Sequence, residues 1–103
     1  MISRHWRALA RAGEAGHYTR HLTDETFPKL SGLPGFIRAS ILRRELSTGT
    51  EFVIVTEWES LDAIKGFAGD DPETAVVPAV VQAMMLEYDS RVRHYEVAKV
   101  HDR

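Results

Sequence analysis

Apolar and polar side chains alternate in two segments of the chain and a third segment contains a short apolar run, and both patterns predict β-strands. These segments run from Ile2 to Ala10, from Phe36 to Leu46 and from Glu51 to Trp58. A fourth strand is expected from Arg91 to Val100. A short connection containing Gly49 joins the second and third segments, so these two segments are expected to form a hairpin.

The same alternation predicts the faces of the sheet. In the second strand, Ile37, Ala39 and Ile41 are expected on one face, and Phe36 and Leu42 on the other. The FVIV run of the third strand is apolar throughout, which indicates that both faces of the sheet are covered. The side chains expected on the face without helices are Trp6, Phe36, Leu42 and part of the FVIV run.

Helical spacing marks the segment before the second strand. Tyr18, Leu22, Thr26 and Leu30 recur every four residues, so they are expected to share one face of a helix. Pro28 lies late in this helix and is expected to kink or end it, because proline lacks a backbone N–H.

Further helices are expected after the third strand. Ser60 has the character of a helix cap and Gly69 that of a stop. The Asp71-Pro72-Glu73 sequence is expected to start another helix, with proline in its first turn. The segment from Val76 to Leu86 is apolar on nearly all sides, which predicts a helix buried on every side.

The predicted order of elements is β-α-β-β-α-β, the ferredoxin-like pattern of the α+β class. Right-handed crossovers give a four-stranded antiparallel sheet in the order 4-1-3-2, with helices on one face. Residues 1–103 have the length of a single domain. Two such sheets packed face to face would form a dimeric α+β barrel, so a homodimer is expected.

Composition narrows the possible functions. The chain has no cysteine, which excludes thiolate catalysis, disulfides and cysteine-based metal sites. A net charge of −2 gives no electrostatic basis for binding nucleic acid. No apolar run approaches the ~20 residues that span a bilayer, and the amino terminus does not resemble a secretory signal. A cytoplasmic protein without membrane contact is therefore expected.

Several short motifs together resemble the antibiotic-biosynthesis monooxygenase family of dimeric α+β barrels. They are the Pro34-Gly35-Phe36 turn, the strand ending at Trp58, the helix from Leu61 to Gly69, and the closing sequence from His94 to Val97. This family includes cofactor-independent oxygenases of aromatic polyketides, haem-degrading enzymes and members without known activity. The resemblance implies the barrel fold and leaves the activity open among these classes.

The resemblance can be followed residue by residue for the haem-degrading branch. Its members use an asparagine, a tryptophan and a histidine, which correspond here to Trp6, Phe67 and Val77. None of the three residue types matches, and valine offers no nitrogen to bind iron. Haem degradation by that mechanism is therefore disfavoured.

Five residues are candidates for a site. His94 is the candidate for acid–base chemistry, because imidazole titrates near neutral pH, and Arg4 is a candidate for holding a substrate anion. Trp6, Trp58 and Phe67 are candidates for the walls of an aromatic pocket. Each also has a purely structural interpretation: a histidine bonded within the sheet, an arginine reaching water, and aromatic rings that pack the core or an interface.

A metal or organic cofactor is not expected. His17, His21 and Glu25 are spaced by one helical turn, a pattern on which metal sites are built, but the simpler interpretation is a solvated helix face. No glycine-rich phosphate loop joins a strand to a helix, so nucleotide and flavin dependence lack support.

The sequence is compatible with three functions. The first is a cofactor-independent monooxygenase of a small electron-rich aromatic such as an anthrone or quinol. The second is a non-catalytic barrel that binds a small apolar ligand or assists another protein, since fold does not fix function. The third is an isomerase or cyclase that acts without oxygen.

Overall fold

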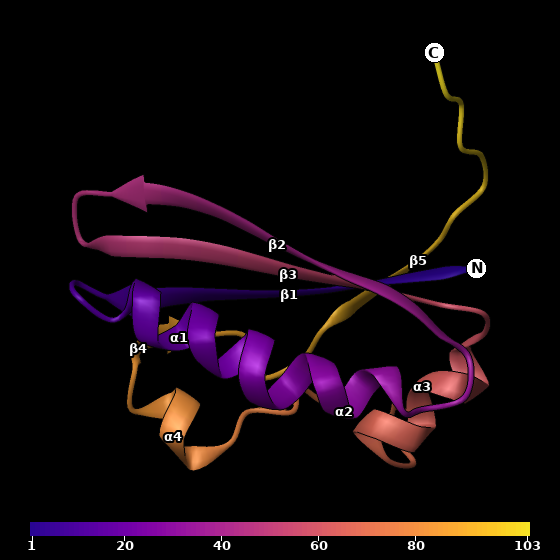
Figure 1. The fold of residues 1–103 in the computed structure, drawn as a ribbon, viewed down its shortest axis with the longest axis horizontal. Helices are drawn as coiled ribbons and strands as arrows, with labels where there is room; N and C mark the ends of the chain where they lie inside the picture. The colour runs from indigo at the N-terminus through magenta and orange to yellow at the C-terminus, as the bar shows by residue number, and fades with distance from the viewer.

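Antiparallel strands form one sheet with the helices on a single face in the computed structural model, which describes residues 1–103 (Figure 1). The strands are β1 (Ile2–Arg11), β2 (Phe36–Leu46), β3 (Gly49–Trp58), β4 (Met85–Tyr88) and β5 (Arg93–Glu96). The helical segments are α1 (Ala15–His21), a π-helical turn (Leu22–Thr26), α2 (Phe27–Ser31), α3 (Leu61–Ala68) and α4 (Ala79–Gln82). None of the helices has the length and apolar character needed to cross a membrane.

The strand order confirms the ferredoxin-like prediction. Neighbouring strands follow the order β2-β3-β1-β4, and β5 also pairs with β1. Two short strands thus share the position expected for one, with β4 opposite residues 8–10 and β5 opposite residues 2–5. Between them the chain leaves β1, because Ser90 and Val92 bond to the backbone of Ala75 and Glu73 instead.

A β-bulge changes the faces predicted for β2. The register passes from Phe36 opposite Trp58 directly to Arg38 opposite Glu57, so Ile37 is the extra residue. Phe36 therefore shares the helix-covered face with Ala39 and packs its ring on Trp58, whereas Ile37 is exposed. The expected placement of Phe36 and Ile37 was wrong for this reason.

Trp6 also lies on the helix-covered face, contrary to expectation. It shares this face of β1 with Arg4 and Ala8, and its ring meets Tyr18 of α1 edge-on at 6.3 Å between centroids. The open face of the sheet, the one without helices, carries Leu42 and, from the FVIV run, Val53 and Val55, as expected. Its apolar character is therefore smaller than the sequence suggested.

The first helical region runs through Pro28 without a break. The five residues before α2 form a π-helical turn, so the hydrogen-bond register has already changed when the chain reaches Pro28. Pro28 therefore does not end the helix, one of the two outcomes expected of it. The helix ends at Ser31, and Gly35, with a φ of 84°, completes the predicted turn into β2.

Residues 69–78, which we call the strap, are irregular rather than helical, with a bend at residues 70–71 and a turn at residues 72–73. Asp71 does act as a cap, but its carboxylate accepts from the Glu73 N–H in an isolated turn. The carbonyl oxygens of Pro72 and Thr74 are bound by the side chain of Arg4, so they are not available for a helix. The helix expected at Asp71-Pro72-Glu73 is therefore wrong, because a tertiary contact overrides the local signal.

The predicted helix from Val76 to Leu86 is also wrong. Only Ala79–Gln82 is helical, and β4 begins at Met85. Of the apolar side chains in this segment, Val81 and Met85 are buried in the core, but Val76, Val80 and Leu86 are exposed. The apolar residues therefore serve a short helix, the strap and a strand, rather than one buried helix.

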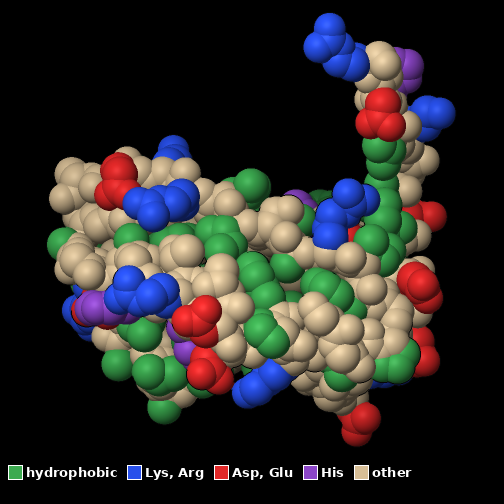
Figure 2. Space-filling model, viewed as in Figure 1, with side chains coloured by type: hydrophobic (Ala, Val, Ile, Leu, Met, Phe, Trp, Pro, Cys, Tyr) green, Lys and Arg blue, Asp and Glu red, His purple; other side chains and the backbone are tan.

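Two apolar clusters form the core between the sheet and the helices. One surrounds Phe52 and Tyr18, and the other consists of Leu30, Trp58 and Ile64. After Val97 the chain leaves the body as an extended tail, which stands clear of the remaining surface in the space-filling view (Figure 2).

Candidate functional site

An inner cavity of about 60 Å³ lies between the sheet, the first helical region and the strap. Most of its lining is apolar, and the rings of Trp6, Phe27 and Phe67 contribute to it. The polar side chains at its wall are those of Arg4, Tyr18, His21, Thr26 and Thr56. A mostly apolar pocket with a few convergent polar groups is typical of small-molecule sites.

A wider outer mouth of about 350 Å³ adjoins the inner cavity. The two spaces share His21, Thr26, Phe67, Val76 and Pro78, so the mouth leads directly into the cavity. The residues that line only the mouth are Glu25, Lys29, Leu33 and Gly66. The mouth thus carries two charged side chains, those of Glu25 and Lys29, whereas the lining of the interior is mostly apolar.

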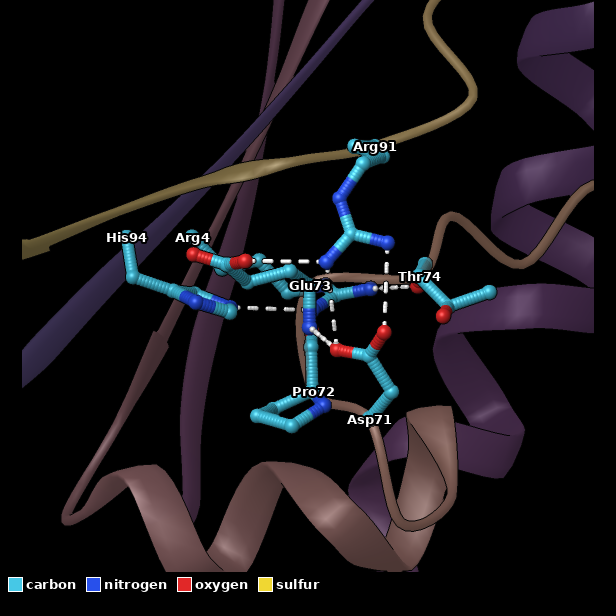
Figure 3. A network of polar contacts seen from close by, with 7 residues as sticks. All are labelled: Arg4, Asp71, Pro72, Glu73, Thr74, Arg91 and His94. Carbon is cyan, nitrogen blue, oxygen red and sulfur yellow. Dashed lines mark hydrogen bonds and ion pairs between the residues drawn. The ribbon is translucent and has the colours of Figure 1, made fainter.

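Arg4 projects from β1 into the wall of the cavity and is only 4% exposed. Its guanidinium donates from Nη1 to the carbonyl oxygen of Pro72, and from Nη2 to that of Thr74 at 2.8 Å. Nη1 also donates to Nε2 of His94 at 2.9 Å (Figure 3). The buried arginine therefore joins the sheet to the strap.

The charge of Arg4 is not neutralised by a carboxylate of the chain. Its guanidinium forms no ion pair, and burial lowers its pKa to about 10, so it remains a cation at neutral pH. A buried cation that is bound only by carbonyl oxygens and a neutral imidazole raises the electrostatic potential of the cavity. The site therefore favours an anionic ligand over a cationic one.

His94 lies behind Arg4 and does not line the cavity. It faces Arg4 across the β1–β5 register, and its Nε2 accepts a hydrogen bond from the guanidinium. Burial and the Arg4 charge both lower the pKa of His94, which favours the neutral ring. The position of His94 thus suits the orientation of Arg4 better than contact with a ligand.

The three candidate aromatic residues take different positions. Trp6 and Phe67 line the cavity, and the indole N–H of Trp6 donates to the Asp89 carbonyl oxygen at 2.7 Å. Trp58 is fully buried and stacks against Phe67 with ring centroids 6.3 Å apart. Trp58 therefore supports the cavity wall from behind, and the Arg4 guanidinium lies over the Phe67 ring at 5.7 Å.

Two polar residues of the cavity were not chosen as site residues from the sequence. Tyr18 fitted the apolar stripe of the first helix, and His21 fitted its solvated face. They are three residues apart, a spacing that places side chains on neighbouring parts of one helix face. This spacing was the available signal, and the core pattern around Tyr18 obscured it.

Ion pairs hold the strap on its outer side. Arg91 binds Asp71 at 3.1 Å and Glu73 at 2.9 Å (Figure 3), and it also forms a backbone bridge with Thr74.

The inner cavity is smaller than the ~150 Å³ that admits a benzene ring. An aromatic ligand must therefore occupy the mouth as well, or displace the strap.

Replacing Arg91 by alanine should loosen the strap without unfolding the protein. Its ion pairs are exposed and screened by solvent, so they contribute little to stability and the midpoint of urea unfolding should change little. Amide hydrogen exchange over residues 71–76 should become faster, because opening of the strap no longer breaks these ion pairs. Arg93, an exposed arginine on β5 without an ion pair, provides the control: Arg93→Ala should leave exchange unchanged. Equal exchange in both variants would show that Arg91 does not restrain the strap.

The amino-acid sequence matches one known protein family. Residues 1–77 match the sequence model of the family described as antibiotic biosynthesis monooxygenase. A search of curated proteins gives no significant match. Several solved structures share the fold.

SnoaB, a cofactor-independent oxygenase from Streptomyces nogalater, is 16% identical with a TM-score of 0.62, and the match covers 96% of this chain and 94% of SnoaB. The monooxygenase ActVA-Orf6 of Streptomyces coelicolor, solved with nanaomycin D, is 17% identical with a TM-score of 0.63, over 98% and 92% of the two chains. MhuD, solved as a variant with manganese protoporphyrin IX, is 19% identical with a TM-score of 0.66, over 100% of each chain. At these identities the comparisons show a common fold.

Proposed function

The chain belongs to the antibiotic biosynthesis monooxygenase family, and we propose that it is a cofactor-independent monooxygenase of a small electron-rich aromatic such as an anthrone or quinol. The observation that carries this proposal is the buried guanidinium of Arg4, which has no carboxylate partner and borders a cavity with aromatic walls. A deprotonated phenol or enol is a flat anion, so it complements both the charge and the rings. SnoaB, with the same fold, is a cofactor-independent oxygenase, which supports this choice.

In this mechanism the ring system binds between Trp6 and Phe67 with its anionic oxygen near Arg4. A guanidinium has five N–H donors. Arg4 uses three of them in hydrogen bonds within the protein, so the others can donate to a ligand. His94 orients the guanidinium through Nε2. Stabilisation of the ligand anion by a preorganised cation lowers the barrier to its formation.

The substrate anion supplies the electrons in the proposed reaction. The methylene carbon of an anthrone loses its two hydrogens and gains one oxygen atom as a carbonyl, and the second oxygen atom leaves as water. Dioxygen is the only co-reactant, and the protein binds the anion, orients it and excludes bulk water. No residue of the chain is oxidised or reduced.

Oxygen dependence is the experiment that tests the proposal. Chelator-treated protein should convert anthrone to anthraquinone under air and consume oxygen, and it should form no product under argon. The rate should not depend on added haem. A product that is an isomer of the substrate, formed equally under air and argon, would indicate an isomerase or cyclase, and a rate that requires haem would contradict a cofactor-free mechanism.

A non-catalytic binding barrel is the second candidate. The observation that favours it is that Arg4 binds the strap carbonyls of Pro72 and Thr74, a structural task that needs no substrate. In that case the same aromatic would bind without oxygen uptake. The experiment under air separates the two functions.

We also propose that the protein forms a homodimer through the open face of the sheet. Val53 and Val55 lie at the centre of this face and are only half-buried, with the exposed Leu42 beside Val53. Ion pairs of Arg38 with Glu57 and of Arg44 with Glu51 flank them. An apolar strip with a polar rim is the usual anatomy of a protein interface.

Native mass spectrometry should give about 23 kDa, twice the 11.6 kDa of one chain. Val55→Arg should shift the protein to the monomer, because it places an unpaired charge at the centre of the interface. Thr48→Arg in the hairpin turn provides a control that should remain dimeric. A wild-type monomer would contradict the barrel.

A further inference from the structure

His21 is the last residue of α1 and lies at the junction of the inner cavity and the mouth. Its side chain is half-buried and makes no hydrogen bond or ion pair within the chain. Both ring nitrogens are therefore free to contact a ligand. An imidazole at the wall of an apolar cavity, with no structural partner, is well placed for proton transfer.

The other four histidines of the chain have different surroundings. His5 makes a hydrogen bond with Ser3 and lies opposite Val55 on the open face of the sheet. His17 is exposed and pairs with a glutamate of its own turn, and His94 accepts a hydrogen bond from Arg4. His101 lies in the projecting tail. His21 is therefore the one histidine that borders the cavity.

Groups complementary to His21 are present at the wall of the same cavity. Tyr18 is 2% exposed, lines the cavity, and its hydroxyl makes no hydrogen bond within the chain. Burial raises the pKa of Tyr18, so this hydroxyl stays protonated and can donate to a ligand oxygen. The Tyr18 hydroxyl and the Arg4 cation can together stabilise the negative charge that remains when a ligand loses a proton.

Few other charged side chains line the cavity and the mouth near His21. The charged side chains that line the cavity and the mouth are Arg4 from β1, and Glu25 and Lys29 from the same helical region as His21. The strap contributes Val76 and Pro78, and α3 contributes Gly66 and Phe67, which carry no charge. The Glu25 carboxylate lies at the mouth. A proton taken up by His21 reaches water most directly on this side.

Building on the aromatic-binding function proposed above, we propose that His21 accepts the proton that the bound ligand loses. An acidic O–H or C–H bond of the ligand breaks, its electron pair stays on the ring system, and the proton forms an N–H bond with the imidazole. The resulting anion faces Arg4 and the Tyr18 hydroxyl, and the proton leaves through the mouth. This assigns proton transfer to His21 and leaves His94 to orient Arg4.

The assignment also restricts the class of ligand. The ligand must carry its acidic group where the cavity meets the mouth, with the rest of its rings in the two spaces on either side. Anthrones, quinols and hydroxyquinones have such a group on the edge of a planar ring system. A purely hydrocarbon aromatic has none, so it should bind without proton transfer.

The ionisation of a coloured phenol tests the proposal without any turnover. We choose 1,2-dihydroxyanthraquinone, whose absorbance changes on deprotonation, and its dimethyl ether, which cannot ionise. In wild-type protein the bound probe should be more ionised than free probe at the same pH. In His21→Gln its apparent pKa should rise by about one unit or more, because the imidazolium partner is lost. The dimethyl ether should bind both proteins equally.

His17→Gln is the matched control, because His17 lies one turn earlier on the same helix and does not line the cavity. It should behave like wild type. If the probe binds His21→Gln with an unchanged apparent pKa, proton acceptance by His21 is wrong, although the aromatic site remains. If wild-type protein binds neither compound, both this inference and the proposed function are wrong.

Discussion

Replacing Arg4 by methionine should reduce anthrone oxidation about 100-fold or more, because the change removes the buried cation that stabilises the substrate anion. Methionine is uncharged and unbranched, so it can replace the aliphatic part of the arginine side chain without adding bulk. The loss should therefore appear mainly in kcat, since the charge interaction is strongest when the anion forms. Steady-state oxygen consumption at several anthrone concentrations measures this effect.

The same substitution should lower the free energy of unfolding, because the carbonyl oxygens of Pro72 and Thr74 lose their donor. Each lost hydrogen bond typically removes about 0.5–1.5 kcal/mol of stability, so the urea midpoint should fall clearly. Arg4→Lys separates the two effects, because lysine keeps the charge but lacks the planar fork that binds two carbonyls at once. It should lose stability and retain more activity than Arg4→Met.

Arg20 provides the control for these variants. It is exposed on α1 and lines neither the cavity nor the mouth. Arg20→Met should leave oxygen consumption unchanged and alter stability only slightly. If Arg4→Met, shown to be folded, oxidised anthrone at the wild-type rate, the proposed role of the cation would be wrong.

Replacing Trp58 by alanine should cause the largest loss of stability among single substitutions in the core. The side chain is fully buried among Leu30, Ile64 and the rings of Phe36 and Phe67. Removal of a buried tryptophan typically costs 3–5 kcal/mol, about 4 kcal/mol here, because the structure closes the resulting space only in part. Urea unfolding followed by far-ultraviolet circular dichroism measures the loss.

The change should also affect the cavity, because Phe67 loses the ring that supports it. Trp58→Phe should retain part of the stacking and fall between wild type and alanine. Leu61→Ala, an exposed position on α3, should change stability by about 0.5 kcal/mol or less. A Trp58→Ala variant as stable as Leu61→Ala would show that this cluster is not essential to the fold.

The sequence predicted the sheet well because alternation and turn residues act locally. β2, β3 and the connection between them follow the predicted segments closely, and Ser60 caps α3 by accepting from the Ala63 N–H. The bulge at Ile37 could not be predicted from the sequence, because Phe36 and Ile37 are both apolar and either one fits the buried face. The faces of Phe36 and Ile37 were exchanged for that reason.

The strap was missed because a distant side chain decides its structure. Asp71 and Pro72 form a good local helix start, but the Arg4 guanidinium, 68 positions earlier in the sequence than Pro72, takes the carbonyl oxygens that a helix would use. This contact also removes Arg4 from the solvent. No local pattern contains that information, since it depends on the register of β1 against β5.

The candidate site was predicted in part. Arg4, Trp6 and Phe67 line one cavity as expected for a shared pocket. His94 and Trp58 lie behind this lining, where they contact Arg4 and Phe67 respectively. Their role as site residues stays a prediction, and the position of each residue relative to the cavity follows from strand register and helix rotation, which alternation alone does not give.

The most direct test of the proposed function is the fate of isotopically labelled dioxygen. Chelator-treated wild-type protein should convert anthrone under ¹⁸O₂ to anthraquinone that carries one labelled atom, with the other found in water. Arg4→Met should form little labelled product in the same time. Unlabelled anthraquinone from wild-type protein, or equal labelling with and without protein, would contradict the assignment as a cofactor-independent monooxygenase.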